Sequence, residues 1–313
     1  MIVTVRGPLD SSSLGRTLIH EHILVDFSAM DITSRDKYDT DDVIEKVTPF
    51  LEDLQRFGFT GFVDCTPSYL GRDIRLLYKL SERLDMHIIT NTGYYGAAND
   101  RYVPKFAYEE REEKLANRWI KEYRDGIEDT GIRPGFIKIG VDPGPLSEID
   151  RKLVSASAIT HLETGLTIAC HTGEGKAALD VLNVIKSYKV SPSALIIVHA
   201  DSIKDRDVIF KLADEGCWVE LDSVGSKPIE THLELIGEVI KRNFISQLLI
   251  SQDAGWYRVE EPDGGMNKFN PYIHIPEILI PALVRDISED IINIIFIENP
   301  TRALSISGRK LCS

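Results

Sequence analysis

Eight short runs of β-branched and other apolar residues recur along this 313-residue chain, each followed by a longer segment with helical periodicity. The runs cover residues 17–25, 60–66, 87–92, 136–141, 166–171, 195–199, 217–221 and 247–251. Among the helical segments, residues 42–57 place Val43, Val47, Phe50, Leu51 and Leu54 on one stripe. Uniformly apolar strands are typical of parallel sheets buried on both faces. Eight such units therefore predict an α/β fold, a (β/α)8 TIM barrel.

No linker, repeat or low-complexity tract interrupts this alternation, so we expect one barrel domain over residues 1–313. The formal net charge of −13 argues against nucleic acid and against an anionic membrane surface as partners, because both require basic protein surface. No apolar stretch approaches the roughly 20 residues that span a bilayer. The four cysteines lack C-x-x-C spacing and no signal peptide precedes His20, which predicts reduced thiols in a cytoplasmic protein.

The first apolar run contains His20 and His22. Because successive side chains on a strand point to opposite faces, two histidines at this spacing share a face and can bind one metal ion. The pair alone fits a buried strand with two hydrogen-bonded histidines equally well. Further polar residues lie in or just after later runs, namely Lys138 in the fourth, His171 in the fifth, His199 in the sixth and Asp253 after the eighth.

Taken singly, each of these residues has an ordinary structural explanation. Lys138 could be a snorkelling lysine, His171 and His199 could be core histidines, and Asp253 could cap a helix. Gathering six polar groups at barrel strand ends is costly unless something compensates, and divalent metal ions do so best. Imidazole and carboxylate ligands fit Zn²⁺, with Mn²⁺, Co²⁺ or Fe²⁺ as substitutes.

Together these residues resemble the phosphotriesterase-like branch of the amidohydrolase superfamily, which includes phosphotriesterase-related proteins and phosphotriesterase-like lactonases. The similarity covers the whole chain, and its motifs are specific in combination. They are TLIHEH at 17–22, TGYY at 92–95, GFIKI at 135–139, HT at 171–172, IIVH at 196–199, SQD at 251–253 and ENP at 298–300.

The resemblance implies a site for two divalent metal ions. In it, His20, His22 and Asp253 bind the more buried ion, His171 and His199 bind the more exposed ion, and Lys138 bridges both. An ammonium group would repel the two ions, whereas a neutral lysine amine that captures CO₂ becomes an anionic carbamate able to bridge them.

This ligand set implies a hydrolase in which a metal-bridging hydroxide attacks a carbonyl or phosphoryl centre. Such a hydroxide exists near neutral pH because coordination lowers the pKa of water toward about 7. Asp253 is expected to shuttle the proton. Tyr95 resembles the tyrosine beside the hydroxide in lactonase members, although an aromatic that merely packs at the barrel mouth explains it equally well.

The expected substrate is a small molecule with a carboxylic ester, with a lactone favoured and phosphotriester hydrolysis as a side activity. The alternatives are an amidase, an aryl-ester or phosphotriester hydrolase on the same site, non-hydrolytic carbon chemistry, and a non-catalytic ligand-binding barrel. Many members that act on acyl homoserine lactones carry arginine where Ser223 stands, which weakens that assignment. A homodimer is left open.

Substrate specificity is expected to come from the loops after the seventh and eighth strands. Residues 254–273 predict a long loop in which Trp256 and Tyr257 contact the substrate, and paired glycines in it predict a flexible tip able to close as a lid.

Two basic residues on these loops, Arg258 and Lys227, are predicted to clamp a phosphate or carboxylate group of the substrate. The competing interpretation is a surface ion pair between Arg258 and Glu260 or Glu261.

Overall fold

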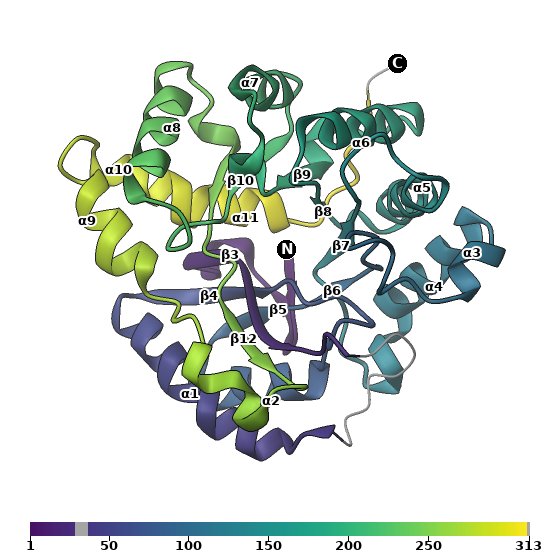
Figure 1. The fold of residues 1–313 in the computed structure, drawn as a ribbon, viewed down its shortest axis with the longest axis horizontal. Helices are drawn as coiled ribbons and strands as arrows, with labels where there is room; N and C mark the ends of the chain where they lie inside the picture. Colours follow the sequence, from purple (N-terminus) through teal and green to yellow (C-terminus); the bar gives the residue numbers. More distant parts are fainter. Residues whose placement is uncertain (29–36, 312–313) are drawn as a thin grey trace.

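A computed structural model describes residues 1–28 and 37–311, and in it a ring of strands is surrounded by helices (Figure 1). Hydrogen bonds order the strands as β12-β3-β4-β5 and as β6-β7-β8-β9-β10-β11, with all neighbours parallel. Their bounds are β3 Arg16–Val25, β4 Phe59–Asp64, β5 His87–Ile89, β6 Asn91–Thr92, β7 Phe136–Gly140, β8 Ile168–His171, β9 Leu195–Val198, β10 Trp218–Leu221, β11 Leu248–Ile250 and β12 Gly255–Arg258.

Two junctions close these strands into a barrel. Only Thr90 separates β5 from β6, so the two segments together form the third predicted strand. At the other junction the amide of Asp253 donates to the carbonyl of His20 at 3.1 Å, and the amide of His22 donates to the carbonyl of Ala254 at 2.9 Å. The predicted (β/α)8 barrel is confirmed.

The main outer helices are α1 Thr40–Arg56, α2 Ile74–Leu84, α4 Glu112–Asp125, α5 Glu148–Thr164, α6 Gly175–Ser187, α7 Arg206–Asp214 and α8 Ile229–Lys241. Short helices follow the last strands or lie between α2 and α4, at α3 Phe106–Glu109, α9 Ile280–Leu283, α10 Glu289–Asn293 and α11 Asn299–Leu304. A hairpin of β1 Ile2–Thr4 and β2 Gly7–Leu9 precedes the barrel. None of the described helices is long and apolar enough to cross a membrane.

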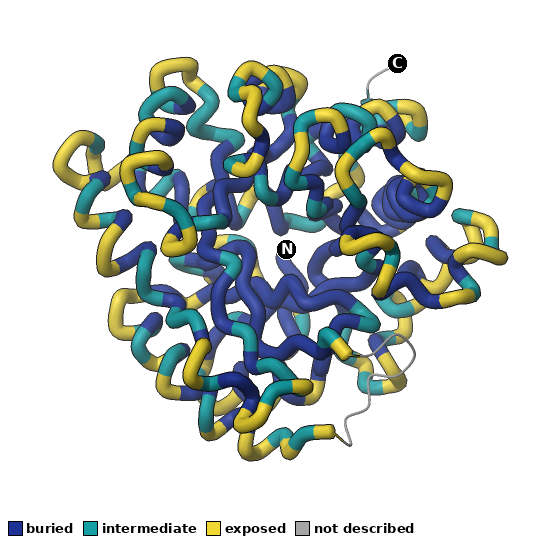
Figure 2. The backbone as a smooth tube through the Cα atoms, viewed as in Figure 1, coloured by how far each residue is buried: buried dark blue, intermediate teal, exposed yellow. Residues whose placement is uncertain are grey.

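Local sequence explains where these helices begin and which face they bury. The side chain of Asp39 caps α1 by accepting from the amides of Asp41 and Asp42. The predicted apolar stripe of this helix is buried except for Phe50, which is half-buried. In α5, Ser147 and Asp150 form a reciprocal capping box, and the helix ends at Gly165 in the left-handed conformation. These helices cover the outer face of the strands, and Figure 2 shows the buried backbone concentrated in the central ring.

The barrel interior is a packed core and not a pore. One cluster of buried apolar side chains receives a member from each of the eight strands, namely Ile19, Val63, Ile89, Phe136, Ala169, Ile196, Trp218 and Leu249. Polar residues stand at the C-terminal ends of the same strands, so this layer forms the floor of the site.

The segment after Asp253 differs from the predicted long loop. Its first residues form β12, which pairs in parallel with β3, and residues Pro262–Lys268 form 3-10 turns. Gly264 is buried at φ +65° with its backbone directly against the ring of Tyr257, where a Cβ atom would not fit. Asp263 lies 2.6 Å from Lys46 of α1. Where the sequence predicts a flexible glycine tip, the segment thus contacts Tyr257 and α1, and β12 extends along the C-terminal part of β3.

Candidate metal centre

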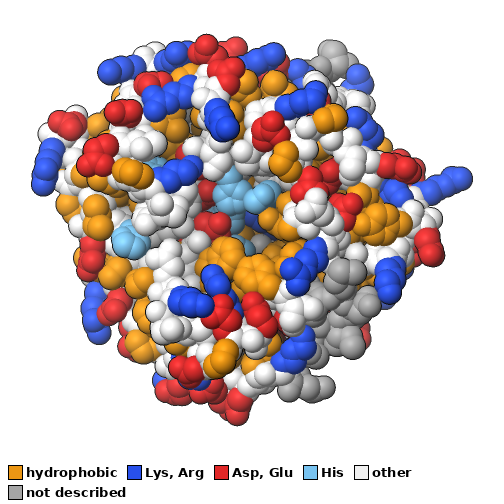
Figure 3. All heavy atoms as spheres, in the orientation of Figure 1, with side chains coloured by type: hydrophobic (Ala, Val, Ile, Leu, Met, Phe, Trp, Pro, Cys, Tyr) orange, Lys and Arg blue, Asp and Glu red, His pale blue; other side chains and the backbone are white. Residues whose placement is uncertain are grey.

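The C-terminal ends of the strands bring all six predicted ligands into one cavity of about 180 Å³. Figure 3 looks onto this face and shows histidines in a hollow near its centre, with an apolar patch along one side. The remaining lining is mostly apolar or aromatic and comprises Val25, Phe27, Cys65, Pro67, Leu70, Tyr95, Ala98, Tyr102 and Trp256.

The ligand candidates fall into two sets. In the first, which we call the inner group, His20, His22 and Asp253 offer atoms that lie within 4.8 Å of one another. Within it, Asp253 Oδ1 lies 3.1 Å from His22 Nε2 and 3.8 Å from His20 Nε2. In the second, the outer pair, the rings of His171 and His199 have centroids 4.4 Å apart.

Lys138 reaches the inner group from the middle of β7. Its Nζ atom lies 3.2 Å from His20 Nε2, and the residue is only 2% exposed. It thus points at the nitrogen that His20 would present to a metal ion. An amine in this place adds a positive charge if protonated, whereas a carbamate would add two anionic oxygens.

Two acidic residues that sequence reasoning missed contact the Nδ1 atoms of two of these imidazoles. His20 Nδ1 lies 2.7 Å from Glu220 Oε1 and 3.1 Å from Asp222 Oδ2, and His199 Nδ1 lies 2.6 Å from Asp222 Oδ1. Since an Nδ1–H donates to these oxygens, Nε2 of His20 and His199 keeps its lone pair for the cavity. The missed signal was two acidic residues two positions apart at the end of the seventh apolar run, the same spacing as His20 and His22.

The other two histidines have neutral partners. His22 Nδ1 lies 2.7 Å from the Thr66 hydroxyl, and His171 Nδ1 lies 3.1 Å from the Tyr95 hydroxyl. The Tyr95 ring also meets the His171 ring edge to face, with centroids 5.2 Å apart. Tyr95 therefore lies at the outer pair.

Two of the six candidate ligands have a left-handed backbone. His199 has φ 59° and Asp253 has φ 49°, a conformation that costs a non-glycine residue of order 1 kcal/mol or more. The backbone amide of His199 donates to Asp222 Oδ2 at 2.9 Å, so one carboxylate holds both its ring and its main chain. Asp253 lies in a segment held by Glu21, which accepts from the Ser251 hydroxyl and from the amides of Gln252 and Ala254.

Burial and neighbouring charges set the protonation of the histidines. Burial, and then the positive charge of Lys138, lower the pKa of His20 to about 4. Burial and the neighbouring His199 lower the pKa of His171. Burial opposes the charge of His199 too, but Asp222 outweighs it and raises the pKa of that ring. The neutral imidazole is the form that binds metal, so His20 and His171 are prepared for an ion, whereas an ion at His199 must compete with a proton.

The pKa values of the buried acidic groups shift in opposite directions. Burial raises the pKa of Glu220 and raises that of Glu21 to about 8. Burial opposes ionisation of Asp222 and Asp253 as well, yet the histidines beside them hold both pKa values below the ordinary range. Asp222 and Asp253 are therefore carboxylates at neutral pH.

The donor set fits a divalent cation. Asp253 Oδ1 is buried and has no hydrogen-bond partner among the described residues, although it lies beside His22. A buried carboxylate oxygen without a partner is costly, and a cation between it and neutral imidazole nitrogens would compensate. Nitrogen and oxygen ligands of this kind suit zinc and neighbouring transition metals.

The structure places only part of the predicted substrate contacts at this cavity. Trp256 lines it, and its ring centroid lies 5.0 Å from that of His22 and 5.5 Å from that of Phe27. Phe27 and Tyr102, with ring centroids 6.3 Å apart, extend this aromatic wall and were not predicted. Tyr257 is buried elsewhere, with Lys46 over its ring.

Neither predicted basic clamp residue lines the cavity. Arg258 Nη1 pairs with Glu261 at 2.9 Å, which is the competing interpretation of this residue. Lys227 Nζ donates to the Asp201 carbonyl at 2.9 Å and to the Ser202 hydroxyl at 3.2 Å. Both side chains are held by partners on their own or neighbouring loops, so Lys138 is the one basic side chain among the described lining residues.

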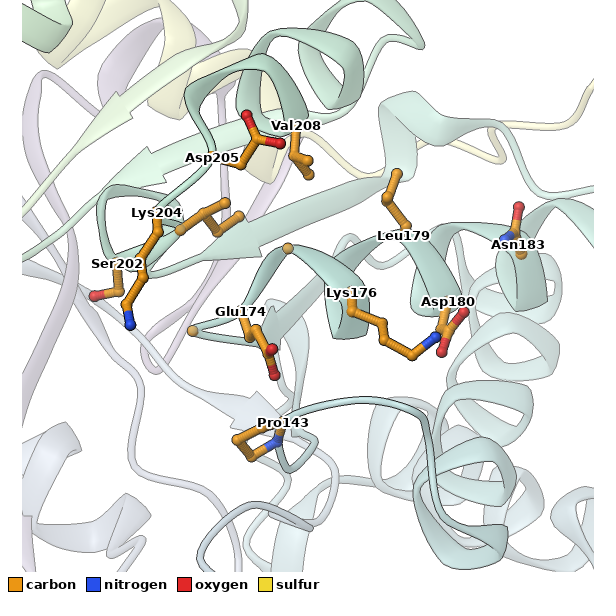
Figure 4. Close-up of a pocket in the computed structure, with 13 residues that line it drawn as sticks. Pro143, Glu174, Lys176, Leu179, Asp180, Asn183, Ser202, Lys204, Asp205 and Val208 are labelled. Carbon is orange, nitrogen blue, oxygen red and sulfur yellow. The ribbon is translucent and has the colours of Figure 1, made fainter.

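A larger hollow of about 890 Å³ lies on the loops that follow β8 and β9 (Figure 4). Its lining mixes acidic and basic side chains, including Glu174, Lys176, Lys204 and Asp205, and contains none of the six candidate ligands. The smaller cavity holds the groups able to do chemistry, so size does not identify the functional site here.

Comparisons with known proteins show what the chain is similar to. A model of the Phosphotriesterase family matches residues 1–304. An N-acetyltaurine hydrolase of Dictyostelium discoideum is 30% identical over 273 residues, which cover 82% of this chain and 72% of that protein. An aryldialkylphosphatase of Saccharolobus solfataricus is 28% identical over 312 residues, which cover 96% and 98%.

The fold also matches a solved structure. A mutant of a phosphotriesterase-like lactonase from Deinococcus radiodurans superimposes with a TM-score of 0.87 at 24% identity, over 97% of this chain and all of that one. At this identity the match supports the barrel fold and gives no information about the substrate.

Proposed function

This chain belongs to the phosphotriesterase family and is a metal-dependent hydrolase, and from that premise we propose that it hydrolyses a small, uncharged carboxylic ester, with a lactone as the preferred substrate. The observation that carries the proposal is the cavity itself. Six ligand-type side chains converge on one side of it, and an aromatic wall borders the other.

The size and polarity of the cavity narrow the range of possible substrates. About 180 Å³ is below the usual range for ligand pockets, so the reacting part of the substrate is small. Phe27, Tyr102 and Trp256 favour an apolar group, and neither Arg258 nor Lys227 lines the cavity. We propose an uncharged substrate because these two residues, which were expected to clamp a phosphate or carboxylate, contact other partners.

We assign roles to the residues around the reacting carbonyl. Bound divalent ions would supply Lewis acidity, which polarises a carbonyl and makes water a nucleophile near neutral pH. Asp253 would accept a proton from the attacking water at the carboxylate oxygen that does not bind a metal ion, and would pass it to the leaving oxygen. Tyr95, whose pKa burial raises, stays protonated and can donate a hydrogen bond from its hydroxyl at the outer pair. Lys138, as a carbamate, would join the two metal positions.

Amide hydrolysis is the second candidate. It is favoured by the similarity to the N-acetyltaurine hydrolase of Dictyostelium discoideum, whose name states cleavage of an N-acyl amide. An amide carbonyl would meet the same residues, but its amine must be protonated before it leaves. Asp253 would have to deliver that proton.

The test is a substrate panel with protein stripped of metal and reloaded with Zn²⁺, Mn²⁺ or Co²⁺. The panel compares neutral lactones of increasing chain length, an aryl ester, N-acetyl amides including N-acetyltaurine, and a dialkyl aryl phosphate. We expect the highest kcat/KM on a small neutral lactone, and none without metal. A higher kcat/KM on an amide would favour the second candidate, and turnover of the phosphotriester alone would overturn both.

A further inference from the structure

Two acidic residues at the C-terminal end of β10, Glu220 and Asp222, contact different numbers of ligand histidines. Glu220 and Asp222, two positions apart, are 1% and 0% exposed. Asp222 contacts one histidine of each set, His20 of the inner group and His199 of the outer pair. Among the ligand histidines Glu220 contacts His20 alone, at 2.7 Å, and its carboxyl group also hydrogen-bonds to Asp222. The inner group thus depends on both carboxylates, and the outer pair depends on one.

The contacts with Asp222, which is a carboxylate at neutral pH, are the strongest supports that the ligand histidines have. Hydrogen bonds to carboxylates are shorter and stronger than those between neutral groups. His22 and His171 are held instead by the hydroxyls of Thr66 and Tyr95. The orientation of one imidazole in each set is therefore decided by Asp222, whose two oxygens accept from two rings and from the His199 amide.

We propose that Asp222 is a positioning residue shared by both metal positions, whereas Glu220 is a positioning residue for the inner group alone. The inference rests on the proposed function, because it takes the inner group and the outer pair as two metal positions. It goes further by stating which acidic side chains at the end of β10 determine the metal affinity of each position.

The experiment titrates metal-free protein with Co²⁺ in competition with a chelator, for the native chain and for Glu220→Ala, Glu220→Gln and Asp222→Asn. Loss of a group that orients a metal ligand weakens metal binding by about 10- to 100-fold. We expect Glu220→Ala to raise one of the two dissociation constants by that factor and Asp222→Asn to raise both. Glu220→Gln keeps an oxygen for His20 and should retain near-native affinity.

Anomalous diffraction at limiting Co²⁺ identifies the affected position. Occupancy should fall at the inner group in Glu220→Ala and at both positions in Asp222→Asn. The matched control is Asp150→Asn, which alters a buried carboxyl group of α5 that contacts Ser147 and no ligand histidine. Both constants should be native in this control.

The outcomes separate the two claims. A native chain that binds fewer than two ions would overturn the proposed metal site. A native chain that binds two ions, with both constants raised by Glu220→Ala or only one raised by Asp222→Asn, would overturn the assignment of the carboxylates. If Asp222→Asn fails to fold, Asp222→Ser, which retains a hydroxyl oxygen, takes its place under the same criteria.

Discussion

The hydroxyl of Tyr95 lies 3.1 Å from Nδ1 of His171, at the edge of the cavity that holds the candidate ligands. This contact brings a residue after the third strand to the end of the fifth strand. The two interpretations of Tyr95 differ in whether this hydroxyl also acts on the substrate, which removal of the hydroxyl tests.

Tyr95→Phe is expected to lower kcat on the best substrate by roughly tenfold, which corresponds to about 1.4 kcal/mol in the barrier. A single hydrogen bond contributes about 0.5–1.5 kcal/mol to stability, so the free energy of unfolding should change little. Steady-state kinetics and urea unfolding measure the two effects. A native kcat in a variant of native stability would mean that Tyr95 only packs at the barrel mouth.

Lys138→Ala is expected to abolish activity and to reduce metal content, because the bridge between the two positions is lost. Short carboxylic acids added in excess should restore part of the activity, since a diffusible carboxylate can supply two anionic oxygens at an entropic penalty. Metal analysis and assays with and without acetate or propionate measure this. A variant that keeps full metal content and gains nothing from the acids would contradict the carbamate.

Arg258→Ala is expected to leave substrate choice unchanged. Its partner Glu261 lies 2.9 Å away, and the arginine side chain is 34% exposed, so the ion pair contributes at most about 1 kcal/mol to stability. The ratio of kcat/KM for an anionic lactone to that for its neutral analogue should be native, and Lys227→Ala serves as the matched variant. A loss of kcat/KM on the anionic lactone alone would show that Arg258 binds the anionic group, as the sequence predicts.

Asp150 predicts a pH dependence of stability away from the metal centre. Burial raises its pKa to about 6 in the folded chain, whereas an unfolded aspartate titrates near 3.9. The folded state therefore binds the proton more tightly, and this contribution is complete below about pH 4 and is lost as the pH rises to about 6.

Asp150→Asn removes this titration. The difference in unfolding free energy between the native chain and the variant should shift by up to about 3 kcal/mol between about pH 4 and pH 7, with the native chain losing stability relative to the variant. Urea unfolding of both proteins across that range measures it. Parallel pH profiles would contradict the raised pKa.

Local patterns in the chain were enough to identify the barrel and to select six ligand candidates. Strand and helix periodicity depends on neighbouring residues, and a barrel brings the C-terminal ends of its strands to one face whatever the distance between them in sequence. His20, Lys138 and Asp253 could therefore be placed together from their positions in the pattern, and the structure gathers them around one cavity.

The sequence by itself thus determined the barrel class and the edge at which polar groups meet, because both follow from short-range periodicity. Only the tertiary structure decided which groups support the histidines and which face the substrate. Asp222 supports His20 and His199 because three separate strands converge, and Arg258 turns to Glu261 because β12 adds to the edge of β3. Such pairings depend on distances of a few ångströms between residues far apart in the chain, which no local pattern records.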